Sequence, residues 1–222
     1  MERSHVTTYS GYVSAPATGI TLRPSDGGIF RFDPGALCLE LLLTGGPGPL
    51  ARYEVLDTPA GLLDWVAVCR LDPPGLRLPP VGEDDLAAAR RLRDAVLGLA
   101  AARAHGHPLA AADLAVVNAA AAVPSLVVRM TESAGREWAP GASVAGLLST
   151  VARDAVELFT GPHAAAGRIR ECGGPDCYLL FVDTSRPGRR RWCAMERCGN
   201  RHKVRAHRVR TRSEGEEECP QD

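Results

Sequence analysis

Four cysteines in the last quarter of the chain have the spacing of metal ligands. They form two pairs, Cys172 with Cys177 and Cys193 with Cys198, and fifteen residues separate the pairs. Four thiolates at this spacing match a closed tetrahedral zinc site, in which Zn–S bonds of about 2.3 Å bring the sulfurs within about 4 Å of one another. The pattern predicts one structural Zn2+. Because four cysteine ligands leave no open coordination position, activation of water by the metal is not expected.

The residues within and between the two pairs indicate how the chain returns to the metal. Gly173 to Pro175 allow a tight turn inside the first pair. Tyr178 to Val182 and Arg190 to Trp192 favour two strands around a turn at Ser185 to Gly188, so the spacer is predicted to be a β-hairpin that carries the second pair back to the first. This order of knuckle, hairpin and knuckle at the start of a helix resembles a treble clef.

A basic helix is predicted directly after the second pair, because residues 199–212 have helical propensity and contain no proline. Each residue of an α-helix is rotated by about 100° around the helix axis relative to the one before it, so five arginines fall within an arc of about 80° on one side of the predicted helix. This arginine stripe comprises Arg197, Arg201, Arg205, Arg208 and Arg212. Lys203 widens the positive surface. A second arginine cluster, on the predicted hairpin, comprises Arg186, Arg189, Arg190 and Arg191.

Charge is segregated along the chain. The 222 residues carry 26 basic and 26 acidic side chains, so the formal net charge is zero. Residues 1–167 hold 13 basic and 17 acidic groups, residues 168–212 hold 13 and 4, and residues 213–222 hold 0 and 5. A solvated charged face usually mixes both signs, so the basic segment predicts contact with duplex DNA, with an acidic protein partner as the alternative. The acidic tail is expected either to fold back on the basic helix as a weak phosphate mimic or to be solvated.

The other cysteines and the apolar segments indicate the cellular compartment in which the protein is expected. Cys38 and Cys69 lie singly in apolar surroundings and Cys219 lies in the acidic tail, which favours metal binding in a reducing cytoplasm over a disulfide framework. Residues 1–12 are too polar for a signal peptide. The most apolar stretch, residues 109–128, is interrupted by polar residues and proline, so no membrane span is expected.

The remaining elements predict an α+β protein with a mainly helical N-terminal domain and a small sheet. Helices are expected from Pro59, capped by Thr58, and from Glu83 to Leu99. Further expected elements are an edge strand at 29–32, a helix at 110–122, a hairpin of 126–130 with 136–138, and a helix from Ser143 to Phe159. Residues 36–43 are apolar without a decisive period. The loop 161–167 is the expected boundary, which gives a domain at 1–165, a zinc finger at 168–212 and a tail at 213–222.

The N-terminal region shows no catalytic set. It contains no glycine-rich phosphate loop, no histidine pair at helical spacing and no nucleophile elbow. Asp113 and Asn118 interrupt an apolar helix, where hydrogen-bonded structural or exposed residues are the expectation. We therefore expect a protein that is not an enzyme.

The finger segment closely resembles the CGNR zinc finger. Cys198 to Arg201 spell that motif, and further matching residues are Phe181, Asp183, Ser185, Arg190, Arg191, Trp192, Cys193, Met195 and Lys203. In bacteria this finger follows a domain called ABATE, in proteins proposed to be stress-induced transcription regulators. Earlier residues match ABATE in order, namely Leu37 to Glu40, Thr44, Leu56, Thr58, Pro59, Leu62, Trp65, Leu114 and Asn118. The chain has Glu40 where the family often has aspartate, and Leu43-Thr44 in place of an Asn-Thr pair.

Together these features predict a cytoplasmic, zinc-dependent, DNA-binding transcription regulator. The resemblance implies zinc at the four cysteines and DNA binding by the finger. The second arginine cluster is expected to contact phosphates, while Arg201, Arg205 and Arg208 reach base edges. The alternative is a module that docks on an acidic protein of the transcription machinery without touching DNA. The N-terminal domain is expected to sense a small molecule or to form a homodimer.

Overall fold

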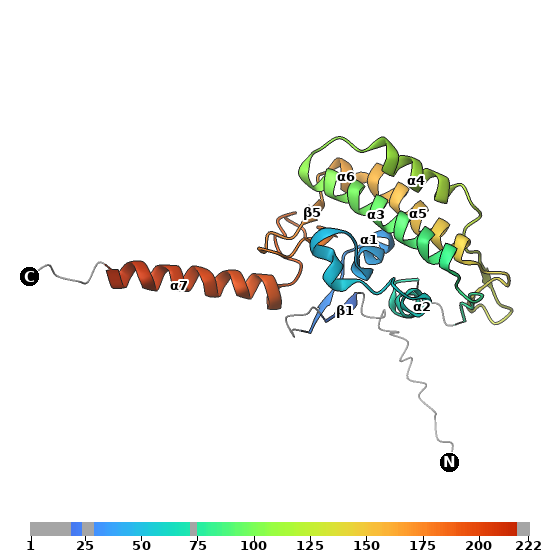
Figure 1. The fold of residues 1–222 in the computed structure, drawn as a ribbon, viewed down its shortest axis with the longest axis horizontal. Helices are drawn as coiled ribbons and strands as arrows, with labels where there is room; N and C mark the ends of the chain where they lie inside the picture. Colours follow the sequence, from blue (N-terminus) through green and yellow to red (C-terminus); the bar gives the residue numbers. More distant parts are fainter. Residues whose placement is uncertain (1–18, 24–28, 72–74, 217–222) are drawn as a thin grey trace, which may run out of the picture.

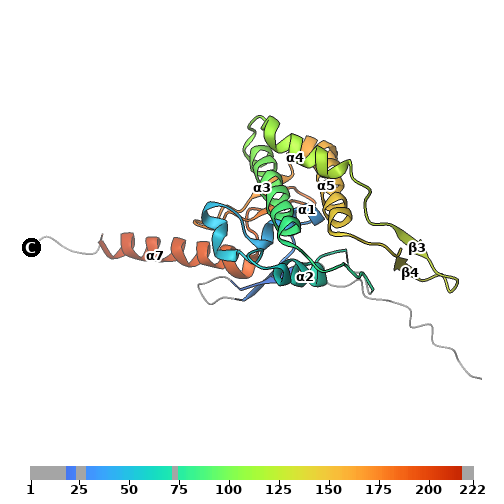
Figure 2. The ribbon, with the colours of Figure 1, turned by 45° about the vertical axis from the view of Figure 1, so that its right-hand side comes forward.

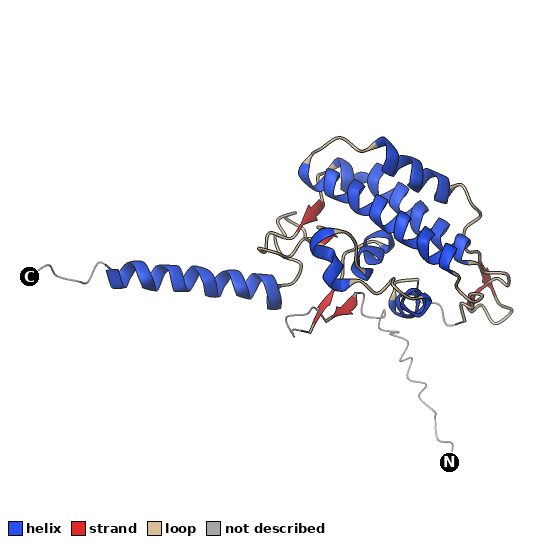
Figure 3. Cartoon of the chain, viewed as in Figure 1, coloured by secondary structure: helices blue, strands red, loops and turns tan. Residues whose placement is uncertain are grey.

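The computed structural model describes residues 19–23, 29–71 and 75–216, with the side chains of 209 and 211–216 outside the description. Within these ranges the chain is mainly helical, with three two-stranded antiparallel sheets (Figure 3). The predicted α+β class with a helical N-terminal part and a C-terminal finger is confirmed. Among the described helices, none has both the length and the apolarity needed to cross a lipid bilayer.

Three helices pack side by side and form the bulk of the N-terminal part (Figure 1). They are α3 (Glu83–His105), α4 (Ala111–Ala121) and α5 (Val144–Thr160). The Ser143 hydroxyl caps α5 by accepting a hydrogen bond from the Gly146 amide at 3.0 Å. In α4, only Val117 is buried. Of the two polar residues that interrupt this helix, Asp113 is half-buried and Asn118 is exposed. The three predicted helices are confirmed within one to six residues at their ends.

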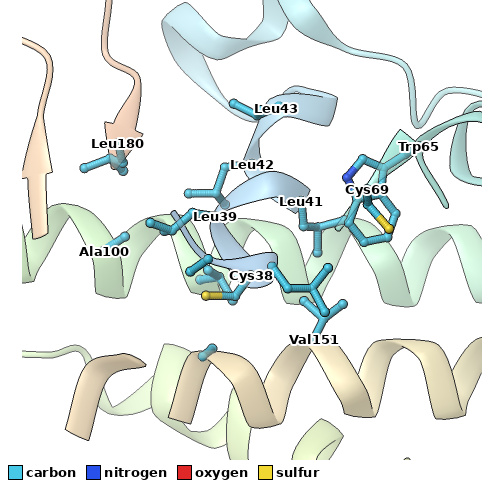
Figure 4. Close-up of a cluster of buried hydrophobic side chains, with 14 of the residues drawn as sticks. Cys38, Leu39, Leu41, Leu42, Leu43, Trp65, Cys69, Ala100, Val151 and Leu180 are labelled. Carbon is cyan, nitrogen blue, oxygen red and sulfur yellow. The ribbon is translucent and has the colours of Figure 1, made fainter. Parts of the chain in front are cut away.

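A short buried segment occupies the centre of the core. It comprises α1 (Leu37–Leu41) and the 3-10 turn η1 (Leu42–Thr44), which resolves the ambiguous apolar run as helix. Its side chains meet Trp65 of α2 (Pro59–Val68), Val151 of α5 and Leu180 of the finger in one cluster (Figure 4). The N-terminal domain and the finger therefore share a continuous apolar core.

Smaller elements surround this core. The predicted edge strand is β2 (Phe30–Phe32), which pairs with β1 (Ile20–Leu22). The 3-10 segment η2 (Gly48–Tyr53) precedes α2 (Pro59–Val68), and the Thr58 hydroxyl accepts from the Gly61 amide as predicted. The predicted hairpin of β3 (Val128–Met130) and β4 (Arg136–Trp138) projects from the end of the molecule opposite the C-terminal helix α7 (Asn200–Glu216) (Figure 2).

The C-terminal elements begin in the segment 161–167, which is predicted to be a loop but contains a short helix. They are α6 (Pro162–Ala165), β5 (Ile169–Glu171), β6 (Leu180–Val182), the π turn η3 (Met195–Gly199) and α7 (Asn200–Glu216). Figure 1 shows α7 extending away from the body of the molecule. Residues 217–222 of the predicted acidic tail lie outside the described residues, and the division at residues 165 and 168 stays a prediction.

Candidate zinc centre and nucleic-acid interface

The hairpin of the finger lies around the first cysteine pair, and the prediction of a hairpin between the two pairs is wrong. Strand β6 pairs with β5, in the register Ile169 to Val182 and Glu171 to Leu180. Residues 189–193 form no strand. The preference for β5 has a physical reason, because Ile169 and Leu180 are both buried in the shared core, whereas the arginine-rich segment 189–191 carries charge that this core cannot accept.

The loop of this hairpin forms the first zinc knuckle. Cys172 donates its amide to the Leu179 carbonyl at 2.9 Å, and the Cys177 amide donates to the Gly174 carbonyl at 3.2 Å. A side chain at Gly174 would not fit, since its Cβ would lie 2.8 Å from the Cys198 sulfur. Glycine is therefore required here by the approach of the backbone to the sulfurs, in addition to the tight turn that the sequence predicts.

The four cysteine sulfurs converge as the spacing predicts. Cys193 and Cys198 come from the segment that opens α7, and the Cys193 sulfur lies 3.6 Å from those of Cys177 and Cys198. All four sulfurs lie within 4.8 Å of one another, and all four residues are buried. A tetrahedral ion with Zn–S bonds of about 2.3 Å requires sulfurs about 3.8 Å apart. The donor set and its geometry fit one structural Zn2+.

The electrostatics of the cluster also suit a cation. Hydrogen bonds from the thiols of Cys177 and Cys193 lower the pKa of Cys172 to about 2. The same hydrogen bond with Cys172 raises the pKa of Cys177, because the donor must keep its proton. A bound Zn2+ would take the place of the shared protons, and binding would release them.

A buried carboxylate orders the loop between the two pairs. Asp183 is 0% exposed and accepts hydrogen bonds from the Ser185 hydroxyl at 2.5 Å, the Ser185 amide at 3.0 Å and the Arg190 amide at 2.9 Å. Burial alone raises the pKa of Asp183, but these hydrogen bonds outweigh it and the net shift is downward. Asp183, Ser185 and Arg190 are among the residues that match the CGNR zinc finger, and in the structure they hold the loop between the two cysteine pairs together.

Arg190, which the sequence predicts to contact phosphate, makes its contacts inside the finger. Its guanidinium donates to the carbonyls of Trp192 at 3.1 Å and Cys193 at 2.5 Å. It also lies 4.2 Å from the centre of the Phe181 ring. The other members of the second arginine cluster, Arg186, Arg189 and Arg191, are exposed. They therefore remain available to a partner, whereas Arg190 supports the zinc loop.

The predicted basic helix is confirmed as α7, which continues from the second knuckle. The His202 ring lies 4.8 Å from the Trp192 ring and links the first turn of α7 to the loop before it. Arg201, Lys203, Arg205 and Arg208 are exposed, and Arg197 is half-buried. The side chain of Arg212 lies outside the described residues.

The arginine stripe faces a groove of about 1200 Å3. Four described members of the stripe line it, namely Arg197, Arg201, Arg205 and Arg208. The first knuckle contributes Gly174 to Cys177, and residues far away in the sequence complete the lining: Ile29, Phe30 and Arg52. The helical periodicity thus correctly placed Arg201, Arg205 and Arg208 on one side of α7, with Arg197 on the turn that precedes the helix. The sequence did not predict that Ile29, Phe30 and Arg52 line the groove, because no local sequence pattern relates these N-terminal residues to the finger.

The patch at which the sequence departs from the resembling family is internal. Glu40 is 1% exposed, and its carboxylate accepts a hydrogen bond from the Arg70 amide at 2.7 Å and lies 3.0 Å from the Arg70 guanidinium. Burial raises the pKa of Glu40, against the opposing effect of Arg70. The buried Thr44 hydroxyl donates to the Leu41 carbonyl. Glu40 is thus bound by Arg70, and Thr44 by the backbone of its own segment.

Comparisons with known families agree with this architecture. Residues 35–162 match the model of ABATE, which is described as "Putative stress-induced transcription regulator". Residues 168–211 match the model of the CGNR zinc finger. A search of curated proteins found no match to the chain. Because the first match covers more than half of the 222 residues, the chain belongs to the ABATE family, and it carries a CGNR zinc finger after the ABATE domain.

Proposed function

We propose that this protein is a zinc-dependent transcription regulator that binds duplex DNA through its finger and α7. The observation that supports this most directly is the groove, since four arginines of the stripe line it beside the zinc knuckle. The segment 168–212 carries 13 basic and 4 acidic groups. Arginine forms charge-assisted contacts with phosphate and pairs bidentately with guanine, so this surface suits a nucleic acid.

Within this proposal the two arginine groups have different tasks. Arg186, Arg189 and Arg191 project from the loop and contact phosphates, which supplies affinity. Arg201, Arg205 and Arg208 lie along an α-helix, the element that fits the major groove, and they reach base edges. The zinc ion holds the start of α7 against the first knuckle. It supports folding and takes no part in chemistry, and the proposal assigns the chain binding without catalysis.

Salt dependence of binding tests the proposal in the zinc-loaded full chain. With three arginines on phosphates, log affinity for duplex DNA should fall against log salt with a slope of roughly −3. Replacing Arg201, Arg205 and Arg208 together by alanine should weaken binding at least tenfold, because the contacts to base edges are lost, while the slope changes less than it would on loss of the phosphate contacts. Alanine keeps the helical propensity of α7, so circular dichroism should stay unchanged.

The matched control removes the same charge elsewhere. Arg77, Arg91 and Arg136 are exposed arginines of the N-terminal domain, and their replacement by alanine should leave DNA binding within about twofold. Affinity that is independent of salt, or equal loss in both triple variants, would contradict the proposal. A chain that binds polyglutamate and fails to bind duplex DNA would instead support docking on an acidic protein.

For the N-terminal domain we propose regulation, through a small-molecule effector or through dimerisation. The support is its place in the chain, because it shares its core with the DNA-binding finger. A ligand screen by thermal shift on the full chain tests the first form, and sedimentation across concentrations tests the second. A chain that stays monomeric and shows no thermal shift with any compound would contradict both.

A further inference from the structure

We infer that the N-terminal part of the chain forms one wall of the DNA-binding groove, where Ile29 and Arg52 lie against the phosphodiester backbone of the duplex bound by α7, while the buried Phe30 holds Arg197 in place. This inference rests on the proposed function and assigns it a second surface outside the finger. The groove is lined from both sides of the module boundary, by α7 and the first knuckle on the one hand and by these three N-terminal residues on the other.

Arg52 holds the first knuckle from the N-terminal domain. It belongs to η2, and its guanidinium donates to the carbonyls of Asp176 and Cys177, the latter at 2.9 Å. Both hydrogen bonds are donated by the same terminal nitrogen, Nη2. A guanidinium has five N–H donors, so the exposed Arg52 side chain keeps donors for an anion in the groove while it positions a zinc ligand.

Arg197 makes the reciprocal contact from the finger to the N-terminal domain. Its guanidinium lies 4.5 Å from the centre of the Phe30 ring, next to strand pair β1–β2. The aromatic ring fixes the position of this guanidinium at the groove. The backbone of the same segment joins the finger, because the Val182 amide donates to the Pro34 carbonyl at 2.8 Å. The wall is therefore held in place by contacts from both directions.

The charge and exposure of the lining select the partner. Five arginines line the groove against two acidic residues, Asp176 and Glu196. Ile29 is 63% exposed at the rim and Val204 of α7 is 50% exposed. A cationic groove with aliphatic rims suits a phosphodiester chain, whose phosphates pair with the arginines while its sugars contact the aliphatic side chains.

Opposite charges placed at Ile29 test the wall without disturbing the zinc site. Ile29→Asp should weaken binding of the zinc-loaded full chain to duplex DNA by roughly three- to tenfold at about 100 mM salt, and Ile29→Lys should tighten it. The matched controls are Val127→Asp and Val127→Lys, since Val127 is 62% exposed beside β3 at the other end of the molecule. Both controls should bind within about twofold of the original chain.

The outcomes separate this inference from the function on which it rests. Loss with aspartate and gain with lysine at position 29 supports the wall, because misfolding would weaken binding in both variants. If the α7 triple variant loses binding while both Ile29 variants match their Val127 controls, the wall is refuted and DNA binding by α7 stands. If the original chain does not bind duplex DNA, both the proposed function and the wall fall.

Discussion

At the scale of single residues, the finger divides its arginines between structure and surface. Arg190 and Arg189 are neighbours in the sequence, yet Arg190 donates to two carbonyls of the zinc loop while Arg189 is exposed. Charge patterning of the sequence cannot separate the two, because both are arginines in one cluster. The difference arises from the buried Asp183, which binds the Arg190 amide and directs that residue inward.

Arg190→Met is expected to lower the free energy of unfolding of the zinc-loaded chain by about 2 to 3 kcal/mol. The substitution removes charge-assisted hydrogen bonds and the contact with the Phe181 ring. Arg189→Met should change the unfolding free energy by less than about 0.5 kcal/mol and weaken DNA binding instead. Denaturant titration measures the first effect. Equal unfolding free energies of the two variants would contradict the structural task of Arg190.

At the scale of elements, close packing determines which helical glycines can be replaced. Gly61 lies in α2, and a Cβ there would come within 1.6 Å of the backbone carbonyl oxygen of Val55. Gly98 lies in α3, where a Cβ would meet only the end of the Asp113 side chain. A carboxylate can rotate away, but a backbone carbonyl in a packed turn cannot.

Gly61→Ala should therefore destabilise the chain by roughly 1 to 3 kcal/mol, although alanine favours the helix. Gly98→Ala should stabilise it by up to about 1 kcal/mol, because the gain in helical propensity meets only a movable side chain. Thermal unfolding of the two zinc-loaded variants gives the comparison. A stabilised Gly61→Ala variant would show that α2 can move away from Val55 at no cost.

Elements were predictable where the signal is local. The hydroxyl caps at Thr58 and Ser143 and the apolar period of α3 predict helices without knowledge of the rest of the chain. The β5 partner of β6 was missed because strand pairing depends on which segment the core can bury. Arg52 was missed because its partners Asp176 and Cys177 lie more than a hundred residues away. The zinc ligands were found because their spacing is itself the chemical requirement.

At the scale of the whole molecule, the finger and the ABATE domain are parts of one core. The zinc ligands and the side chains of α1 belong to the same buried cluster. His105 at the end of α3 also contacts Glu171 of β5 at 3.0 Å. Loss of the metal is therefore expected to affect residues remote from the cysteines.

Chelation of zinc should lower the melting temperature of the full chain by roughly 10 °C or more. Structural zinc sites contribute several kcal/mol to folding, and each kcal/mol corresponds to about 2 to 4 °C in a chain of this size. Amide hydrogen exchange should accelerate in α1 as well as in β5 and β6, and readdition of Zn2+ should restore protection. Unchanged exchange across residues 37–44 after chelation would show that the N-terminal domain is stable without the finger.

The projection of α7 has an energetic consequence for recognition. The helix is fixed at its first turn, and its 17 residues extend about 25 Å. Arginines spaced four residues apart repel one another along its surface, which opposes helix formation by a few tenths of a kcal/mol per pair. A bound polyanion relieves this repulsion. In the proposed complex, the arginines that attract DNA also make the helix itself more favourable once DNA is bound, so that binding and helix formation reinforce each other.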